Sequence, residues 1–136
     1  MKKFQIEFLD HVAIRVKDMK VSAAWYEKVI GLKKYIIPQW DPYPVFLLSG
    51  KSGVALFPAK LEDPDLPFDS KNTKIDHFAF NVTGDNFEKA ISWYDELGLD
   101  YEIKNHELFL SLYTRDPDGH IVELTTINVE ENTFYK

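Results

Sequence analysis

Two histidines and a glutamate are the side chains of this sequence whose types and spacing point to chemistry. His11 lies in the segment LDHVAIRV, and His77 lies at the same place in the similar segment IDHFAFNV. Glu123 lies in HIVELTT, a later strand-like run, on the face that alternate residues share. Two imidazoles and one carboxylate on separate strands suit a divalent Fe, Mn, Zn, Ni or Co ion and leave positions open for water or substrate. We therefore expect His11, His77 and Glu123 to be the ligands of one divalent metal ion.

A metal-free interpretation of the same residues stays open. A single histidine in a strand usually serves as a hydrogen-bonded structural residue, and an imidazolium would satisfy Glu123 without a metal. Two histidines at equivalent points of a repeat, with a carboxylate on the matching terminal strand, favour the metal site. Three such groups buried without a metal would leave a costly unpaired charge.

Tyr113 and Arg15 are the candidate catalytic residues beside this site. Both lie at strand positions expected to share the face of the histidines, where they would serve as proton donor and anion partner. The structural alternatives are a core tyrosine with a satisfied hydroxyl and an arginine paired with an acidic neighbour. His106 and His120 are expected to be exposed.

Each histidine segment opens a longer module that occurs twice. It leads to an expected helix, at 18–32 and at 85–99, that ends in Gly-Leu. Asp18 and Asp85 are the expected N-caps, the second in a capping box with Glu88. The strands expected after the helices are 35–38, 45–48 and 54–57 in the first module and 99–103, 108–114 and 120–126 in the second. Each module therefore reads as βαβββ.

Two βαβββ modules predict an α+β fold, because each has a sheet face that one module cannot cover alone. In the first histidine strand Val12, Ile14 and Val16 form an apolar face, while His11 and Arg15 lie on the opposite, polar face. We expect one domain over residues 1–136, in which the paired modules form a curved, cup-like mixed sheet with the helices outside. The expected parts are module one (8–58), a linker (59–73), module two (74–127) and a tail (128–136).

Length, composition and charge exclude several classes of protein. The 136 residues match a single domain, and the absence of cysteine removes thiol catalysis and thiolate metal sites. A net charge of −6 without a basic cluster argues against nucleic-acid binding. Glu7 and Asp10 interrupt any signal peptide, and no apolar run is long enough to span a membrane. We expect a cytoplasmic protein with a small-molecule substrate.

The paired modules resemble the vicinal oxygen chelate superfamily, which includes glyoxalase I, methylmalonyl-CoA epimerase, extradiol dioxygenases, fosfomycin-resistance enzymes and bleomycin-resistance proteins. The likeness covers about residues 8–127 and rests on LDHVAIRV, WYDELGL and LYTRDPDGHIVEL. It implies ligands on the first and last strands of each module, three of which map to His11, His77 and Glu123. The fourth position, from the Gly53/Gly119 alignment, is Phe57. Phenylalanine can neither ligate nor transfer a proton, which disfavours the glyoxalase I and epimerase reactions.

Fosfomycin-resistance enzymes and extradiol dioxygenases are more similar to this sequence, because they have only two histidines and one glutamate. Fosfomycin-resistance enzymes also match in length and module count. The resemblance places Tyr113 and Ser111 at substrate contacts and Lys104 near a cation-binding loop. This sequence departs from them at Ala13, where a hydroxyl residue is common, and in a tail without the phosphonate-binding arginine.

The resemblance implies a metal-dependent enzyme that acts on a small substrate with vicinal oxygens, by lyase, isomerase or fosfomycin-type transferase chemistry. An extradiol-type ring-cleaving dioxygenase is one alternative, although many have four modules and a further catalytic histidine that neither His106 nor His120 matches. A metal-free small-molecule-binding protein of the bleomycin-resistance type is the other, and it would not need the three ligands. A homodimer is expected, since relatives commonly dimerise and open sheet edges favour pairing.

Overall fold

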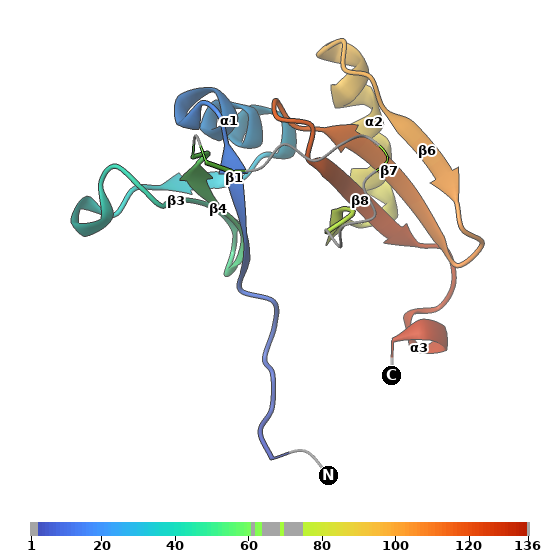
Figure 1. Cartoon of the computed structure of the whole chain (residues 1–136). Helices are drawn as coiled ribbons and strands as arrows, with labels where there is room; N and C mark the ends of the chain where they lie inside the picture. Colours follow the sequence, from blue (N-terminus) through green and yellow to red (C-terminus); the bar gives the residue numbers. More distant parts are fainter. Residues whose placement is uncertain (1–2, 61, 64–68, 70–74, 136) are drawn as a thin grey trace. The chain divides into compact units, whose positions relative to one another are not determined.

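The computed structural model describes residues 3–60, 62–63, 69 and 75–135 (Figure 1). It divides into two compact units, Met1–Asp65 and Leu66–Lys136. Each unit holds one βαβββ module with a four-stranded mixed sheet, so the predicted α+β fold with two such modules is confirmed. Most of the expected linker 59–73 lies outside the described residues. That the two units join into one domain stays a prediction.

The first unit has strand order β1-β4-β3-β2, with β1 parallel to β4 and the other pairs antiparallel. Its elements are β1 (His11–Val16), α1 (Met19–Trp25), the π-helical turn η1 (Tyr26–Ile30), β2 (Lys33–Tyr35), the 3-10 turn η2 (Pro38–Trp40), β3 (Val45–Ser49) and β4 (Ser52–Pro58). Ile14 and Val16 are buried, whereas His11, Ala13 and Arg15 are exposed, as the alternation in β1 predicted. This strand therefore separates an apolar core face from a polar face.

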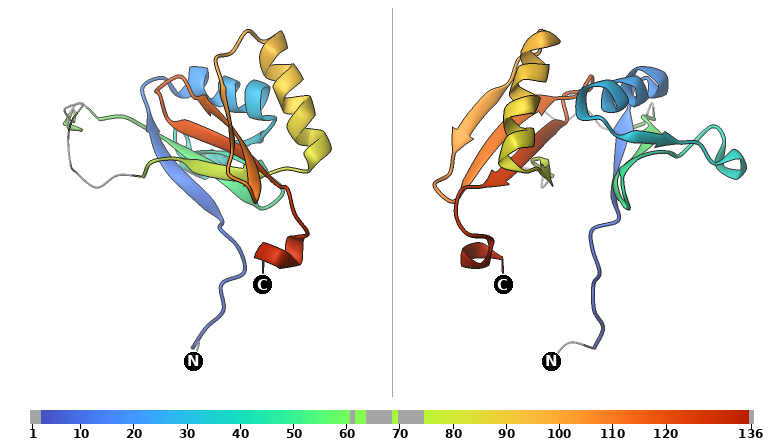
Figure 2. Two further views of the ribbon diagram at one scale, coloured as in Figure 1. Left: turned by 90° about the vertical axis from the view of Figure 1, so that its right-hand side faces the viewer. Right: turned by 180° about the vertical axis from the view of Figure 1, so that it is seen from behind.

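The second unit repeats this order as β5-β8-β7-β6, with β5 parallel to β8. Its elements are β5 (Phe78–Asn81), α2 (Gly84–Glu96), β6 (Glu102–Asn105), β7 (Phe109–Arg115), β8 (Ile121–Ile127) and the short α3 (Glu131–Phe134). Helix α2 covers one face of this sheet, as the opposed views of Figures 1 and 2 show. Phe87 and Tyr94 of α2 are buried, and so are Leu112, Val122 and Leu124 on the strands.

Strand alternation then leaves a second set of side chains on the face opposite α2. We call this the polar face of the second unit, and it carries His77, Asn81, Tyr113, Glu123 and Thr125.

Within the described part of the chain, no helix is long and apolar enough to cross a membrane.

One of the two predicted N-caps is correct and the other is wrong. Asp18 caps α1, and its carboxylate accepts hydrogen bonds from the backbone of Lys20 and Val21 at 3.0 Å. The cap of α2 is Thr83, whose hydroxyl accepts from the Asn86 backbone at 3.2 Å, while Asp85 lies inside the first turn. An acidic side chain there still favours the helix, because it faces the positive end of the helix dipole.

Strands β6 and β2 have other boundaries than those expected. Leu99 donates its backbone N–H to Tyr94 at 3.0 Å, so the residues expected to begin a strand at 99 close α2 instead, and β6 begins at Glu102. Likewise β2 is Lys33–Tyr35 and not 35–38, since Pro38 starts a 3-10 turn and lacks the N–H that a ladder needs.

The strand register corrects the position equivalent to Glu123 in the first unit. Ala13 pairs with Ala55 in the β1–β4 ladder, and its counterpart Ala79 pairs with Glu123 in the β5–β8 ladder. The equivalent of Glu123 is therefore Ala55, not Phe57. The glycine alignment misled because two residues separate β3 from β4 and five separate β7 from β8. Alanine is no more able than phenylalanine to ligate a metal or move a proton.

Candidate metal and substrate site

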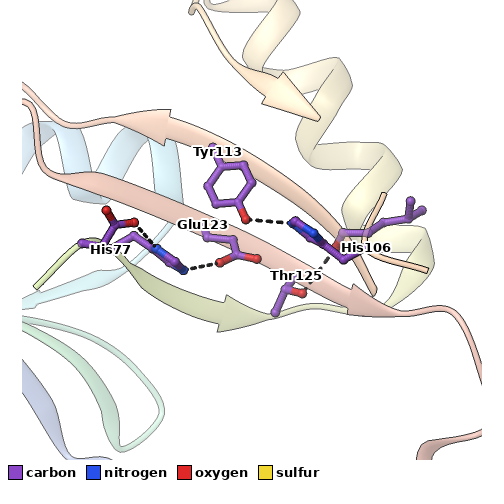
Figure 3. Close-up of polar contacts among 7 residues, drawn as sticks. His77, His106, Tyr113, Glu123 and Thr125 are labelled. Carbon is purple, nitrogen blue, oxygen red and sulfur yellow. Dashed lines mark hydrogen bonds and ion pairs between the residues drawn. The ribbon is translucent and has the colours of Figure 1, made fainter. Parts of the chain in front are cut away.

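A histidine and a buried glutamate meet on the polar face of the second unit. Nε2 of His77 lies 2.9 Å from Oε2 of Glu123 (Figure 3). Glu123 is 7% exposed, because β8 is flanked by β5 and β7. His77 directly precedes β5, and its side chain is 36% exposed. A buried carboxylate is therefore paired with an imidazole that remains accessible from outside.

An aspartate stands behind each of the two histidines. Nδ1 of His77 lies 2.8 Å from Oδ2 of Asp76, and in the first unit Nδ1 of His11 lies 2.7 Å from Oδ1 of Asp10. In both units the Nε2 atom is therefore the nitrogen that points away from the neighbouring aspartate.

Tyr113 joins the pair from the adjacent strand, because it lies directly opposite Glu123 in the β7–β8 ladder. Its ring packs edge-on against His77, with 5.8 Å between the ring centres. On its other side, the Tyr113 hydroxyl lies 3.1 Å from Nε2 of His106 (Figure 3). The Lys104 ammonium lies 5.6 Å from the centre of the Tyr113 ring. The phenol thus lies between an imidazole and the His77–Glu123 pair, next to a cation.

A cavity of about 630 Å³ opens beside these residues. Its lining includes His77 and Tyr113 together with the basic Lys104 and Arg115 and the acidic Asp76 and Glu102. Such a volume accommodates a small organic molecule. With a third carboxylate, that of Asp100, in the lining, the mixed charges suit a polar substrate whose oxygens reach His77 and Tyr113.

In the first unit, His11 lies among aromatic rings. Its ring centre is 5.0 Å from that of Phe46, which is in turn 5.6 Å from that of Trp40. Trp40, Tyr43 and Phe46 line a separate hollow of about 480 Å³. Arg15 donates to the backbone carbonyl of Pro58 at 3.0 Å, so it is held by the main chain.

The donor set of His77 and Glu123 fits a divalent metal ion. Neutral imidazole and carboxylate bind such ions at about 2.0–2.2 Å, which puts two neighbouring ligand atoms about 3 Å apart. The observed 2.9 Å is of this size. Among the described residues, no group of three or more His, Cys, Asp or Glu side chains able to hold a metal ion is found. A third ligand has to be added to the pair, and the addition of His11 stays a prediction.

Sequence reasoning missed the part that His106 takes in this arrangement. His106 is exposed, as expected, yet it contacts the hydroxyl of Tyr113. The tail (128–136) received no role in the sequence analysis, but its Phe134 packs against Phe109 with ring centres 4.8 Å apart. Tyr135 also accepts a hydrogen bond from Asn81 at 3.4 Å, so the tail reaches the polar face.

The fold agrees with the comparison of the sequence with known families. The sequence model of the Glyoxalase/Bleomycin resistance protein/Dioxygenase superfamily matches residues 8–124. The chain belongs to this superfamily, and the predicted resemblance is confirmed.

Two curated relatives are named as thiol or glutathione transferases, and one similar solved structure is named as a fosfomycin resistance protein. The chain is 28% identical over 133 residues to the metallothiol transferase FosB of Staphylococcus saprophyticus, covering 96% of this chain and 83% of FosB. It is 27% identical over 119 residues to the glutathione transferase FosA of Serratia marcescens, covering 88% and 80%. The crystal structure of the fosfomycin resistance protein FosX from Mesorhizobium loti is similar with a TM-score of 0.65 at 25% identity, covering 95% of this chain and 99% of FosX.

Proposed function

We propose that this protein is a metal-dependent enzyme in which His11, His77 and Glu123 bind one divalent ion, Fe, Mn, Zn, Ni or Co. Its substrate is a small molecule with vicinal oxygens, and its reaction is of the transferase, lyase or isomerase type. The observation that carries the proposal is the 2.9 Å contact between His77 and the buried Glu123, beside Tyr113. Such a pair at the edge of a cavity places metal-binding atoms next to a proton-carrying hydroxyl.

The residues around the pair have separate roles in this proposal. A bound divalent ion supplies Lewis acidity that stabilises negative charge on a substrate oxygen. Tyr113 donates a proton to the leaving oxygen, and His106 holds the phenol in place from the other side. Lys104 supplies positive charge near an anionic substrate. Arg15 is the anion partner from the first unit in this proposal, because it carries a guanidinium on the exposed face of β1 that it shares with His11.

Within this scheme, transfer of a thiol to a small electrophilic substrate is the leading reaction. The names metallothiol transferase and glutathione transferase belong to relatives at 27–28% identity, and they support this branch. The presence of alanine at both positions 13 and 55 argues against a proton-transfer residue on the polar face of the first unit. The substrate hydroxyl or epoxide oxygen would then depend on Tyr113 for its proton.

A ring-cleaving dioxygenase is the second candidate, and one contact favours it. His106 lies 3.1 Å from Tyr113, so an imidazole is available for acid–base work near the site, although it matches no catalytic histidine by position. A catecholic substrate carries two neighbouring oxygens, which would suit the open positions that two histidines and one glutamate leave at a metal.

The deciding experiment measures the metal content of the purified wild type and compares it with that of the His77→Ala variant. We expect close to one equivalent in the wild type and little in the variant. Once the bound metal is identified, two activities are measured. The first is product formation from fosfomycin and a low-molecular-weight thiol, and the second is oxygen uptake with catechols. Manganese, nickel or zinc with thiol adduct formation supports the transferase, and iron with oxygen uptake supports the dioxygenase. If neither protein takes up metal after reconstitution, the enzyme proposal fails and a metal-free binding protein replaces it.

We also propose that the protein acts in the cytoplasm as a homodimer. Strands β1 and β5 are terminal in their sheets, and an open sheet edge favours pairing. Sedimentation analysis of the purified chain tests this, and a monomer at micromolar concentration contradicts it.

A further inference from the structure

The same contact is built twice in this chain, once in each unit. Asp10 and Asp76 immediately precede His11 and His77, and each carboxylate lies within 2.8 Å of the Nδ1 atom of the following imidazole. Each contact lies wholly inside one unit, so the two observations are independent of each other.

The chemistry of the pair decides which nitrogen is available to a ligand. A carboxylate only accepts hydrogen bonds, so an imidazole whose Nδ1 atom meets a carboxylate carries its proton there. The Nε2 atom is then the nitrogen that can bind a metal. In the second unit this atom lies 2.9 Å from Oε2 of Glu123, the other proposed ligand, so without metal it too faces a carboxylate, and a metal ion bound by both atoms would take the place of a proton between them. The ring orientation that Asp76 favours is therefore the one that brings the two metal-binding atoms, Nε2 of His77 and Oε2 of Glu123, together.

We propose that Asp10 and Asp76 are positioning residues that fix the Nδ1–H form of His11 and His77 and turn the Nε2 atom of each ring toward the metal. This inference rests on the proposed metal site and goes beyond it, because it assigns roles to two residues outside the ligand set. It also explains why the repeated segments share Asp-His and not histidine alone.

A surface ion pair without a role in binding is the competing explanation. The side chains of Asp10 and Asp76 are 72% and 80% exposed, and exposed pairs contribute little to folding stability. The two explanations differ in what they predict. A surface pair changes neither stability nor metal affinity when it is removed, whereas a positioning residue changes affinity alone.

The test compares zinc affinity in Asp10→Ala, Asp76→Ala and the matching Asn variants, and the His11 tautomer in the Asp10 variants. Asn keeps an acceptor oxygen, so it should retain most of the affinity, whereas each Ala variant should bind zinc about 10–100-fold more weakly. Asp69→Ala removes the same charge from an exposed linker position and serves as control. All variants should keep the thermal unfolding midpoint of the metal-free wild type.

Long-range ¹H–¹⁵N spectra of histidine-labelled, metal-free protein provide a readout that needs no activity. With its ring neutral, His11 should carry the proton on Nδ1 in the wild type and lose this preference in Asp10→Ala, whereas His77 is left out of this readout because its Nε2 atom also faces a carboxylate, that of Glu123, in the metal-free protein. Unchanged zinc affinity in the Ala variants and an unchanged His11 tautomer in Asp10→Ala would overturn the positioning role while the metal site stands. A wild type that binds no zinc would overturn the metal site and, with it, this role.

Discussion

The hydroxyl of Tyr113 lies 3.1 Å from Nε2 of His106, while the ring of Tyr113 packs against His77. The phenol is thus fixed at both ends, by an imidazole at its hydroxyl and by a proposed metal ligand at its ring. This arrangement suits a proton donor whose position must be constant from one turnover to the next.

Replacing Tyr113 by phenylalanine should therefore lower kcat by about 10²–10⁴, the usual contribution of a positioned acid or base. Metal content should stay at the wild-type level, because the ring and its packing on His77 are kept. His106→Ala should lower kcat by a smaller factor, and His106→Gln should recover part of the loss by restoring a hydrogen-bonding side chain. Steady-state kinetics, with the substrate found by the thiol-adduct or oxygen-uptake assay, measures the kcat of these variants. A Tyr113→Phe enzyme with normal kcat contradicts the role of Tyr113 as proton donor.

The His77–Glu123 pair predicts an effect on stability that needs no metal. His77→Ala leaves the carboxylate of Glu123, 7% exposed, without its imidazole partner. We expect a loss of about 1–2 kcal/mol in the free energy of unfolding, reduced from the cost of a fully buried charge because His77 is partly exposed. Adding Glu123→Gln should recover part of this loss, since the buried charge is gone. Urea unfolding of metal-free proteins measures it, and an additive double variant argues against coupling.

The repeat made most of the fold predictable from sequence. Two copies of Asp-His followed by a helix and three strands fix the module, and alternation in β1 identifies its core face correctly. Glu123 was placed on the polar face by the same alternation, and the structure brings it to His77. These predictions succeed because periodicity and repetition are properties of the chain itself.

The failures share a different cause, which is the geometry of turns. The cap at Thr83 was missed because Asp85 is equally able to cap, and only the extended backbone at Thr83 decides between them. The equivalence of Ala55 to Glu123 depends on the lengths of two hairpin turns. His106 reaches Tyr113 across a turn with Glu107 at a φ of 70°, where no glycine signals the left-handed backbone.

The buried hydroxyl of Tyr94 predicts a pH dependence of stability. Burial raises the pKa of Tyr94 from 10.0 to about 12. The folded state thus holds this proton more tightly than the unfolded state, so its contribution is complete below pH 10 and is lost as the pH rises from 10 through 12. The full loss is about 3 kcal/mol, from about 1.4 kcal/mol for each pKa unit.

Tyr94→Phe should abolish this part of the alkaline destabilisation. Below pH 9 the variant should be at least as stable as the wild type, because the hydroxyl has no hydrogen-bond partner among the described residues. Urea unfolding at pH 8 and at pH 11 compares the two proteins. Tyr101, whose pKa is also raised, mainly by its hydrogen bond to Asp95, titrates in both, so the difference between the curves belongs to Tyr94. Parallel losses in both proteins would contradict the prediction.

The backbone around Gly53 leaves no room for even one methyl group, so we expect substitution of this residue to be destabilising. It pairs with His11 in the β1–β4 ladder, and a Cβ there would overlap the carbonyl oxygen of Leu47 and lie 2.9 Å from Cα of Leu48. Because both contacts are with backbone atoms of β3, no side-chain rotation relieves them. Gly53→Ala should therefore reduce the free energy of unfolding by about 1–3 kcal/mol.

Gly84→Ala is the matched control, since a Cβ at Gly84 meets no atom within 4 Å and the residue begins α2. This variant should be neutral or more stable by up to about 1 kcal/mol, because alanine favours the helix. Urea unfolding of both variants gives the comparison. If Gly53→Ala matched Gly84→Ala, strand β3 would have to yield at Leu47. The β3–β4 ladder, in which Gly53 pairs with Leu48, would then be softer than its backbone packing indicates.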